Sequence, residues 1–381
     1  MSLLIALLVF AYARPIPQAA ATGLVPTLPA AAAVSLPWPA YGQSAIGAVG
    51  HGVLASSGSQ KSAPMASTAK VITALVVLKQ KPLQPGSQGP AISLTDADAA
   101  LYEKYYALGG SVTQVAVGSQ ISQYQALQAL LLPSANNIAD TLAVWAFGSV
   151  DNYLKSSNQY VQAQGLTDTK IADATGFSDQ TISTANNLVK VGELALNNPV
   201  IADIVNQPEA TIPVAGLIRN VNRQLNQDGI VGIKTGNTEG AGGCYLVASK
   251  RVVSGHQITT IGAVMGAPNL TTAMVDSRAL LRASDTGFEE VVVVQKGQSL
   301  GEYTVAWGGK VTAHAKENIS VFRWKGSKTK FTTSLNPQET PIKKGSQVGT
   351  VEVSSGNQKQ QVAAVLAQDI NAPALRWRIF R

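Results

Sequence analysis

Residues 64–79, with the sequence PMASTAKVITALVVLK, place a serine shortly before a long apolar run. The apolar residues recur at helical spacing and Pro64 prevents extension backwards, so the pattern predicts a helix that begins at Ser67. Lys70 then lies one turn beyond Ser67 on the same face, where its amine can reach the serine hydroxyl. The positive end of the helix favours a negative charge that develops on Ser67. These two residues are therefore a candidate nucleophile and base.

Two further motifs follow at separations that suit a serine–lysine acyl-transfer site. They are Ser134-Ala135-Asn136 and Lys234-Thr235-Gly236. Cleavage of an amide bond needs a nucleophile, a base, a proton donor for the leaving amine and donors that bind the developing anion, and the three motifs together supply them. Burial of Lys70 beside a second cation, Lys234, would keep its amine partly neutral, as a base must be. None of these roles requires a histidine, a metal or a cofactor.

Each motif alone is a weak signal, because the chain contains similar ones elsewhere. Ser327-Lys328-Thr329-Lys330 repeats the spacing of the first motif, and residues 297–301 match the Gly-x-Ser-x-Gly elbow of another hydrolase class. The context excludes both, since Ser327 falls in a predicted turn and Ser299 leads into a strand instead of a helix. The alternative for Ser67 is a simple helix N-cap. The order, spacing and context of all three motifs favour the catalytic interpretation.

Composition and charge narrow the class of protein. The 381 residues are 45% hydrophobic and 13% charged, which indicates a folded chain with a large core. The one cysteine, Cys244, excludes an internal disulfide. A net charge of +7 suggests an anionic neighbour such as a membrane surface or a wall polymer. Nucleic acid is a weak option, because no run of lysine and arginine with interleaved aromatic residues is present.

The N-terminus predicts export. Residues 1–13 read as a signal peptide, because an apolar run from Leu3 to Phe10 precedes the small-x-small site Ala11-Tyr12-Ala13. A transmembrane anchor and a buried strand are the alternatives, although the run is shorter than a bilayer span. The Ala/Pro-rich residues 14–39 then form a poorly structured linker. We expect the mature protein at the extracytoplasmic face of the membrane or in the wall.

Two domains follow the linker. Residues 40–287 predict an α/β (α+β) domain, with an antiparallel sheet flanked by helices and a helical cluster. Residues 288–381 predict a small all-β domain. Helices are expected at 124–132, 136–147 and 271–282. A meander of antiparallel strands is expected at 229–235, 243–249 and 257–265. The strands of the second domain are expected at 290–294, 303–307, 319–324, 347–353 and 361–366. The tail 372–381 contains three arginines and two large aromatic residues, which suits weak, salt-sensitive contact with an anionic membrane.

The chain resembles the serine-type D-alanyl-D-alanine carboxypeptidases, which are low-molecular-mass penicillin-binding proteins, from about residue 45 to 370. The resemblance rests on the three motifs and their surroundings, notably residues 64–70, 131–139, 220–225 and 232–238, and on 341–345 and 348–350 in the β domain. It implies a β-lactamase/transpeptidase-like fold for residues 40–287. The implied partners are the peptidoglycan stem peptide, as substrate, and β-lactams, as inhibitors.

The resemblance also implies roles for particular residues. Ser67 would attack the carbonyl of the penultimate D-Ala, and Lys70 would take its proton. Backbone amides of Ser67 and Asn237 would form the oxyanion hole. Ser134 would relay a proton to the leaving D-Ala, and Asn136 would hold the amide of the substrate.

The third motif would bind the substrate's terminal carboxylate through Lys234 and Thr235, with Gly236 in the same binding strand. The arginine that assists the carboxylate in relatives has no secure counterpart. Arg219 and Arg223 flank the expected place, where Val221 stands. Carboxylate binding is therefore the part of the site that the resemblance leaves open.

Several alternatives remain open at this point. A DD-endopeptidase would share every motif. A class A-like β-lactamase needs a glutamate a few tens of residues beyond the second motif, and none lies between Ser134 and Glu193. A non-catalytic wall-binding protein could keep the fold, although the reactive side chains are all present. A zinc peptidase is disfavoured, because the three histidines are far apart and lack paired ligand spacing.

Overall fold

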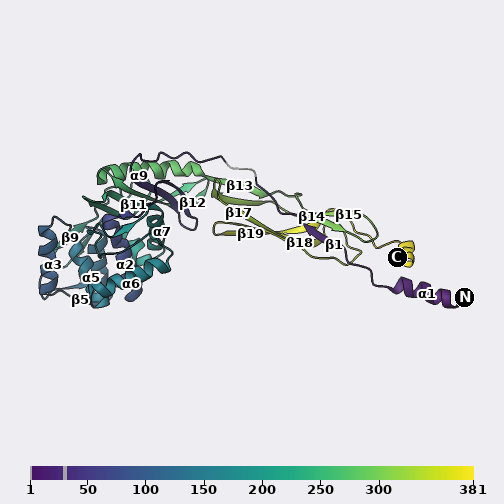
Figure 1. Ribbon diagram of the computed structural model, residues 1–381, viewed down its shortest axis with the longest axis horizontal. Coiled ribbons are helices and arrows are strands. Elements are labelled where there is room, and N and C mark those ends of the chain that lie inside the picture. Colours follow the sequence, from purple (N-terminus) through teal and green to yellow (C-terminus); the bar gives the residue numbers. More distant parts are fainter. Residues whose placement is uncertain (1, 29–31) are drawn as a thin grey trace. The chain divides into compact units, whose positions relative to one another are not determined.

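The computed structural model describes residues 2–28 and 32–381, which form two compact units (Figure 1). One unit is Ser35–Gly287 and contains the three motifs. The other combines Phe288–Arg381 with the N-terminal segment that ends at Val34. Residue 1 of the expected signal peptide and residues 29–31 of the expected linker lie outside the described residues.

A five-stranded antiparallel sheet forms the centre of the first unit, in the strand order β10-β11-β12-β2-β3. The predicted meander is confirmed, and two strands from the start of the unit extend it. The strands are β10 Ile230–Thr238, β11 Gly242–Val253, β12 His256–Ala267, β2 Gln43–Ala48 and β3 Gly52–Gly58. Helix α7 (Ala185–Leu196) and helix α9 (Leu270–Ser284) cover opposite faces of this sheet. Ile261 lies against Gly192 of α7, whereas the neighbouring Gly262 lies near Leu281 of α9.

A helical cluster packs beyond α7 and surrounds helix α2 (Ala69–Gln80). Every residue of α2 from Ala69 to Leu78 is buried, as expected of a helix that is apolar on all sides. Its neighbours are α4 Gln123–Leu131, α5 Asn136–Phe147 and α6 Val150–Ala163, with α3 Asp96–Ala107 and α8 Pro199–Val205 further out. Short paired strands connect these elements: β4 Ala63–Pro64 with β7 Ile182–Ser183, β5 Ala91–Ser93 with β6 Gln120–Ser122, and β8 Glu209–Ile212 with β9 Gly216–Arg219.

The second unit is built on a six-stranded antiparallel sheet, so the expected all-β domain is confirmed. Its strand order is β1-β14-β15-β19-β18-β17, and β13 pairs separately with β16. The strands are β13 Phe288–Val294, β14 Ser299–Thr304, β15 Lys310–Ala315, β16 Ile319–Trp324, β17 Thr329–Leu335, β18 Gln347–Ser355 and β19 Gln358–Leu366. The sequence did not predict β15 or β17. Strand β17 lies at the sheet edge and is rich in Thr, Ser and Lys, so its apolar periodicity is weak.

The expectation of an unstructured linker over residues 14–39 is wrong in one part. Ala20–Gly23 form strand β1, which pairs with β14 so that Ala20 lies opposite Thr304. The hydroxyl of Thr333 also donates to the Leu24 carbonyl at 2.7 Å. A four-residue strand without apolar alternation, paired with a partner about 280 residues away, leaves no local sequence signal.

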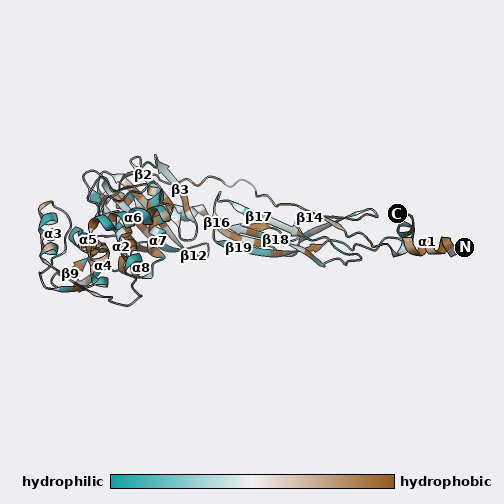
Figure 2. Cartoon of the chain, turned by 60° about the horizontal axis from the view of Figure 1, so that its bottom comes forward, coloured by the Kyte–Doolittle hydropathy of each residue, from teal (hydrophilic) through white to brown (hydrophobic). Residues whose placement is uncertain are grey.

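The N-terminal residues form helix α1, Ser2–Ala13, and this excludes the alternative of a buried strand. Figure 2 shows α1 largely in the brown of hydrophobic residues, and its large apolar side chains are exposed. It contacts the short helix α10, Leu375–Phe380. The Arg378 guanidinium lies 3.8 Å from the ring centroid of Tyr12 and donates to the Tyr12 carbonyl at 2.6 Å. Within the described residues, no helix has the length and apolar character needed to cross a membrane.

Candidate active site

The first motif begins in a 3₁₀ turn that precedes the α-helix. Ala66–Thr68 form a 3₁₀ turn, and α2 itself starts at Ala69, so the prediction that the helix begins at Ser67 is wrong by two residues. The cause is Ala66, whose φ of 48° takes the chain through the left-handed region directly before the serine. The Lys70 amine nevertheless lies 2.9 Å from the Ser67 hydroxyl oxygen. The structure therefore brings the predicted nucleophile and base together.

The Lys70 side chain is fully buried and has two further partners. Its Nζ donates to the Asn136 Oδ1 and to the Thr175 carbonyl, both at 2.7 Å. Burial, followed by repulsion from Lys234, holds the pKa of the Lys70 amine well below its usual range. Asp173 and Asp140 oppose that shift without reversing it. This shift favours the neutral amine, the form that can accept a proton.

The second motif occupies the break between α4 and α5. Ser134 has a φ of 70°, a conformation that non-glycine residues adopt mostly where surrounding structure enforces it. Its hydroxyl oxygen is buried and has no hydrogen-bond partner among the described residues. Asn136 begins α5, and its backbone N–H donates to the Ser111 carbonyl at 2.7 Å. The break thus presents an unpaired hydroxyl beside an amide that is already bonded to Lys70.

The third motif lies on strand β10, where Lys234 is paired in register with Leu246 of β11. The Lys234 side chain is 2% exposed, and its Nζ donates to the Thr235 carbonyl at 2.9 Å. Burial lowers the pKa of Lys234 to about 7. Gly236 packs against the 3₁₀ turn, and a Cβ at this glycine would lie 2.9 Å from the Ser67 amide nitrogen. Strand β10 therefore carries the third motif directly to the first, and Asn237 follows at the exposed end of the same strand.

Asp173 and Thr175 are site residues that sequence reasoning did not find as such. They lie between α6 and α7, where the Thr175 carbonyl accepts from Lys70. The available signal was Asp173-Ala174-Thr175-Gly176, in which Gly176 adopts a φ of 70°. Such a turn is common in loops. The turn belongs to the site only because its Thr175 carbonyl contacts Lys70 of α2.

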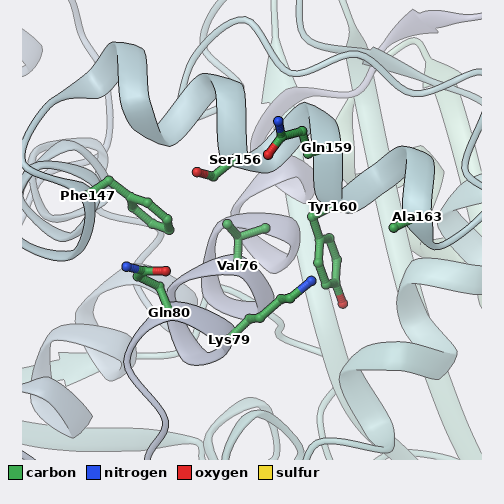
Figure 3. Close-up of a pocket in the computed structure, with 8 residues that line it drawn as sticks. All are labelled: Val76, Lys79, Gln80, Phe147, Ser156, Gln159, Tyr160 and Ala163. Atoms are coloured by element: carbon green, nitrogen blue, oxygen red, sulfur yellow. The ribbon is translucent and has the colours of Figure 1, made fainter.

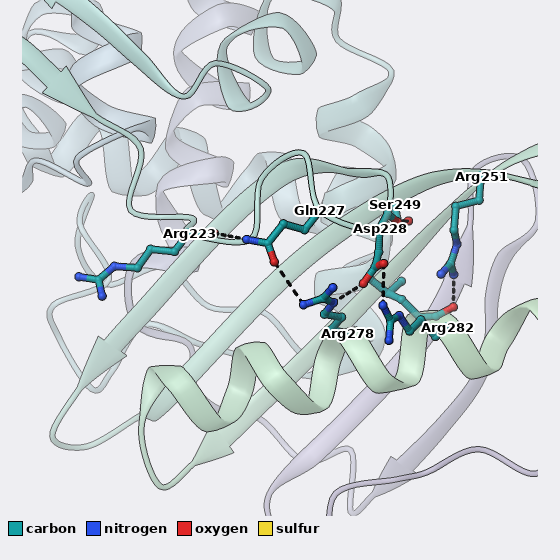
Figure 4. A network of polar contacts seen from close by, with 8 residues as sticks. Arg223, Gln227, Asp228, Ser249, Arg251, Arg278 and Arg282 are labelled. Atoms are coloured by element: carbon teal, nitrogen blue, oxygen red, sulfur yellow. Dashed lines mark hydrogen bonds and ion pairs between the residues drawn. The ribbon is translucent and has the colours of Figure 1, made fainter.

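Neither of the two arginines that flank Val221 is identified as the carboxylate-binding arginine. Arg219 forms an exposed ion pair with Glu209 at 3.7 Å. Arg223 lies at one end of a polar network, and Figure 4 shows its guanidinium pointing away from the other members. Its backbone carbonyl accepts a hydrogen bond from Gln227. Neither arginine has a contact with the three motifs in the described part of the chain.

The same network fixes the turn that precedes β10. Arg278 and Arg282, one turn apart on α9, both bind the Asp228 carboxylate, and their hydrogen bonds lower the pKa of Asp228 to about 2 (Figure 4). Arg251 pairs with Asp285 at 2.9 Å. All three arginines therefore already bind carboxylates of the protein, and Arg278 and Arg282 hold the residue that precedes β10.

A cavity of about 370 Å³ opens at the other end of α2, away from the motifs. Figure 3 shows the Lys79 amine directed towards the ring of Tyr160, whose centroid is 5.3 Å away. The cavity is lined by Val76, Lys79, Gln80, Phe147, Ser156, Gln159, Tyr160 and Ala163. None of the predicted site residues contributes to this cavity.

In residues 2–28 and 32–381, no group of three or more His, Cys, Asp or Glu side chains is arranged to hold a metal ion.

Both units match models of known protein families. The family model described as D-alanyl-D-alanine carboxypeptidase matches residues 45–269, and that of the penicillin-binding protein 5 C-terminal domain matches residues 288–372. D-alanyl-D-alanine carboxypeptidase DacA of Escherichia coli is 28% identical over 279 residues, which is 69% of this chain and 66% of that protein. DacC of the same species is 26% identical over 86% of this chain and 83% of its own. A D-alanyl-D-alanine endopeptidase of Pseudomonas aeruginosa is 29% identical over 59% and 70%.

A solved structure has the same fold. Penicillin-binding protein 5 from Haemophilus influenzae superposes with a TM-score of 0.63 at 20% identity, covering 89% of this chain and all of the other. The matched families account for both units, and the first model alone covers more than half of the sequence. The chain therefore belongs to the D-alanyl-D-alanine carboxypeptidase family of low-molecular-mass penicillin-binding proteins.

Proposed function

We propose that this protein is a serine-type D-alanyl-D-alanine carboxypeptidase that removes the terminal D-alanine from peptidoglycan stem peptides through an acyl-enzyme on Ser67. The observation that carries the proposal is the 2.9 Å separation of the Lys70 amine and the Ser67 hydroxyl in a buried site that also contains Lys234. Family membership supports the reaction class. The names of the relatives, which are carboxypeptidases and an endopeptidase, support the substrate class.

Acylation would proceed with local proton transfers. The Ser67 hydroxyl proton passes to the Lys70 lone pair as Oγ bonds to the carbonyl carbon of the penultimate D-Ala. The amide N–Hs of Ser67 and Asn237 would bind the oxyanion. The C–N bond then breaks, and the unpaired Ser134 hydroxyl relays a proton to the departing D-alanine amine. Water completes the cycle by hydrolysing the ester and regenerating the Ser67 hydroxyl.

Substrate binding would use the remaining predicted residues. The Asn136 side chain, already fixed by Lys70, would bind the amide of the substrate through its free amide edge. Lys234 and Thr235 would bind the terminal carboxylate of the peptide. A bound carboxylate would favour protonation of Lys234, whose burial otherwise favours the neutral form. This coupling would keep a positive charge beside Lys70 while substrate occupies the site.

An endopeptidase activity is the second candidate, because the relative from Pseudomonas aeruginosa carries that name. It would use the same acyl-enzyme and release a longer amine. β-Lactams would acylate Ser67 in place of the peptide. We further propose extracytoplasmic action, supported by the wall-peptide substrate class and the signal-like N-terminus.

Mass spectrometry after incubation with benzylpenicillin tests the proposal. We expect one adduct on Ser67, and release of D-alanine from a D-Ala-D-Ala-terminated peptide by the unlabelled protein. Ser67→Ala should abolish both. Ser327→Ala, which alters the look-alike motif in the β unit, should change neither. A label on Ser327 or Ser299, or wild-type protein that takes up no penicillin, would refute the assignment.

A further inference from the structure

The Asp173 carboxylate organises the loop between α6 and α7. It accepts five hydrogen bonds, all from residues 175–181 that follow it. Its donors are the Thr175 hydroxyl at 2.5 Å, the Gly176 N–H at 3.2 Å, the Phe177 N–H at 3.0 Å, the Ser178 N–H at 3.3 Å and the Thr181 hydroxyl at 2.5 Å. Asp173 therefore contributes more hydrogen bonds to this loop than any other of its side chains.

The loop docks on α2 through two consecutive carbonyl groups. The Ala174 carbonyl accepts from the Thr73 hydroxyl, and the Thr175 carbonyl accepts from the Lys70 amine, both at 2.7 Å. Thr73 and Lys70 lie one turn apart on the same face of α2. On the other side, Gly176 lies so close to the Ala66 carbonyl that a Cβ would overlap it. The Thr175 carbonyl is thus held in place from both directions.

The number of N–H bonds on the Lys70 amine explains why its contact with the Thr175 carbonyl matters for catalysis. A neutral amine has two N–H bonds and one lone pair. Two of its three neighbours, the Asn136 Oδ1 and the Thr175 carbonyl, can only accept, so they take both N–H bonds. The third neighbour, the Ser67 hydroxyl, is the one that can donate. In the neutral form, which the lowered pKa of Lys70 favours, the lone pair is then left for the hydroxyl proton of Ser67.

We propose that Asp173 is a positioning residue, which holds the Thr175 carbonyl where it fixes one N–H of Lys70 and so aims the amine lone pair at Ser67. The inference rests on the roles proposed above for Ser67 and Lys70. Asp173 acts through the loop and makes no contact with the reacting atoms.

Asp173 also contributes charge to the site. The charged groups that face the Lys70 amine are Lys234 from β10, Asp140 from α5 and Asp173 from the loop. Lys234 lowers the pKa of Lys70, and the two carboxylates raise it. Removing the charge of Asp173 should therefore shift the pKa of Lys70 further down. A residue that served only to hold the loop would lack this effect.

The test compares wild type with Asp173→Asn and the matched control Asp168→Asn, an exposed aspartate of the preceding turn. D-Alanine release is measured from about pH 5 to pH 9. For Asp173→Asn we expect kcat to fall roughly tenfold to a hundredfold with little change in KM, as for a misaligned base. The acid limb of kcat/KM should move to lower pH. Asp168→Asn should change neither kcat nor the position of the acid limb in the pH profile of kcat/KM.

A second variant covers the case in which Asp173→Asn fails to fold. Thr175→Val keeps the Asp173 charge but removes one hydroxyl that ties the loop, so kcat should fall several-fold with the acid limb unmoved. Wild-type kcat in Thr175→Val, or in a folded Asp173→Asn, would overturn the inference. A loss of rate in Asp173→Asn without displacement of the limb would reduce Asp173 to a structural role. If wild type itself takes no penicillin on Ser67, the proposed function fails first, and the two failures are distinguishable.

Discussion

A Cβ at Gly236 would lie 2.9 Å from the amide nitrogen of Ser67, closer than side-chain carbons approach backbone in folded proteins. The third motif and the nucleophile are therefore in contact through their backbones. The Cβ would also lie 2.9 Å from the Cβ of Ala66. Glycine at this position permits β10 to pass directly over the 3₁₀ turn, which carries the Ser67 N–H of the proposed oxyanion hole.

Gly236→Ala should therefore impair both function and folding. The added methyl group meets backbone atoms on the 3₁₀ turn, so either β10 or the turn must shift. We expect a stability loss of about 1–3 kcal/mol and a large reduction in penicillin acylation rate. Denaturant unfolding and stopped-flow acylation measure the two effects. Gly23→Ala, whose nearest contact would be an ordinary 3.6 Å, is the matched control and should behave like wild type. Normal acylation by Gly236→Ala would show that the contact is not required.

Lys234→Met should lose activity yet gain stability at neutral pH. Loss of one charge-assisted hydrogen bond to the substrate corresponds to about 1.5–3 kcal/mol, or roughly a tenfold to hundredfold lower kcat/KM. The gain in stability follows from burial, which lowers the pKa of Lys234 from 10.5 to about 7. The unfolded chain therefore binds the proton more tightly than the folded protein, and Lys234 is least favourable to folding below about pH 7.

The pH dependence of that gain follows from the same shift. As the pH rises from about 7 towards 10.5, wild type recovers stability, and the advantage of Lys234→Met should shrink by up to about 1.4 kcal/mol per pH unit. Urea unfolding at pH 7 and pH 9 measures the difference in the free energy of unfolding between Lys234→Met and wild type. Lys250→Met, at an exposed position of β11, is the matched control for the loss of a lysine side chain. An equal gap at both pH values would contradict the lowered pKa of Lys234.

The penicillin adduct should persist far longer than a β-lactamase acyl-enzyme. No glutamate stands between Ser134 and Glu193, and two aspartates of this stretch already have partners in the protein. The Asp173 carboxylate already accepts five hydrogen bonds, and the Asp179 carboxylate packs over Gly240. Nitrocefin should give one stoichiometric burst followed by slow turnover. Rapid steady-state hydrolysis would require a water-activating base that the site does not present.

Membrane attachment should depend on whether α1 is retained. If processing removes residues 1–13, the remaining tail offers Arg376, Arg378 and Arg381, each worth about 1 kcal/mol near an anionic surface, so high salt should release the protein. If α1 is kept, its exposed apolar side chains add buried area, and release should need detergent. Cell fractionation with salt and detergent washes, followed by N-terminal sequencing of the released protein, tests the prediction. A processed protein that resists salt would contradict it.

Local patterns in the sequence predicted the helices around the first two motifs, the β10–β12 meander, α9 and part of the β unit. The helix over 136–147 and strand 319–324 have the predicted bounds, and the meander and the α9 region differ by a few residues at their ends. These elements combine strong apolar periodicity with clear Gly or Pro boundaries, which are properties of neighbouring residues. Strands β1 and β17 lack that periodicity. Their pairing comes from distant partners, so it could not be read locally.

The site divides in the same way. Sequence alone was enough to propose the reactive side chains, Ser67, Lys70, Ser134 and Lys234, because the chemistry of acyl transfer restricts which residue types can serve and in what order. Only the tertiary structure decided how the amine of Lys70 is directed, since that depends on a carbonyl oxygen at Thr175. Every residue has a carbonyl group, and its direction is set by packing and by Asp173, neither of which leaves a mark in sequence spacing.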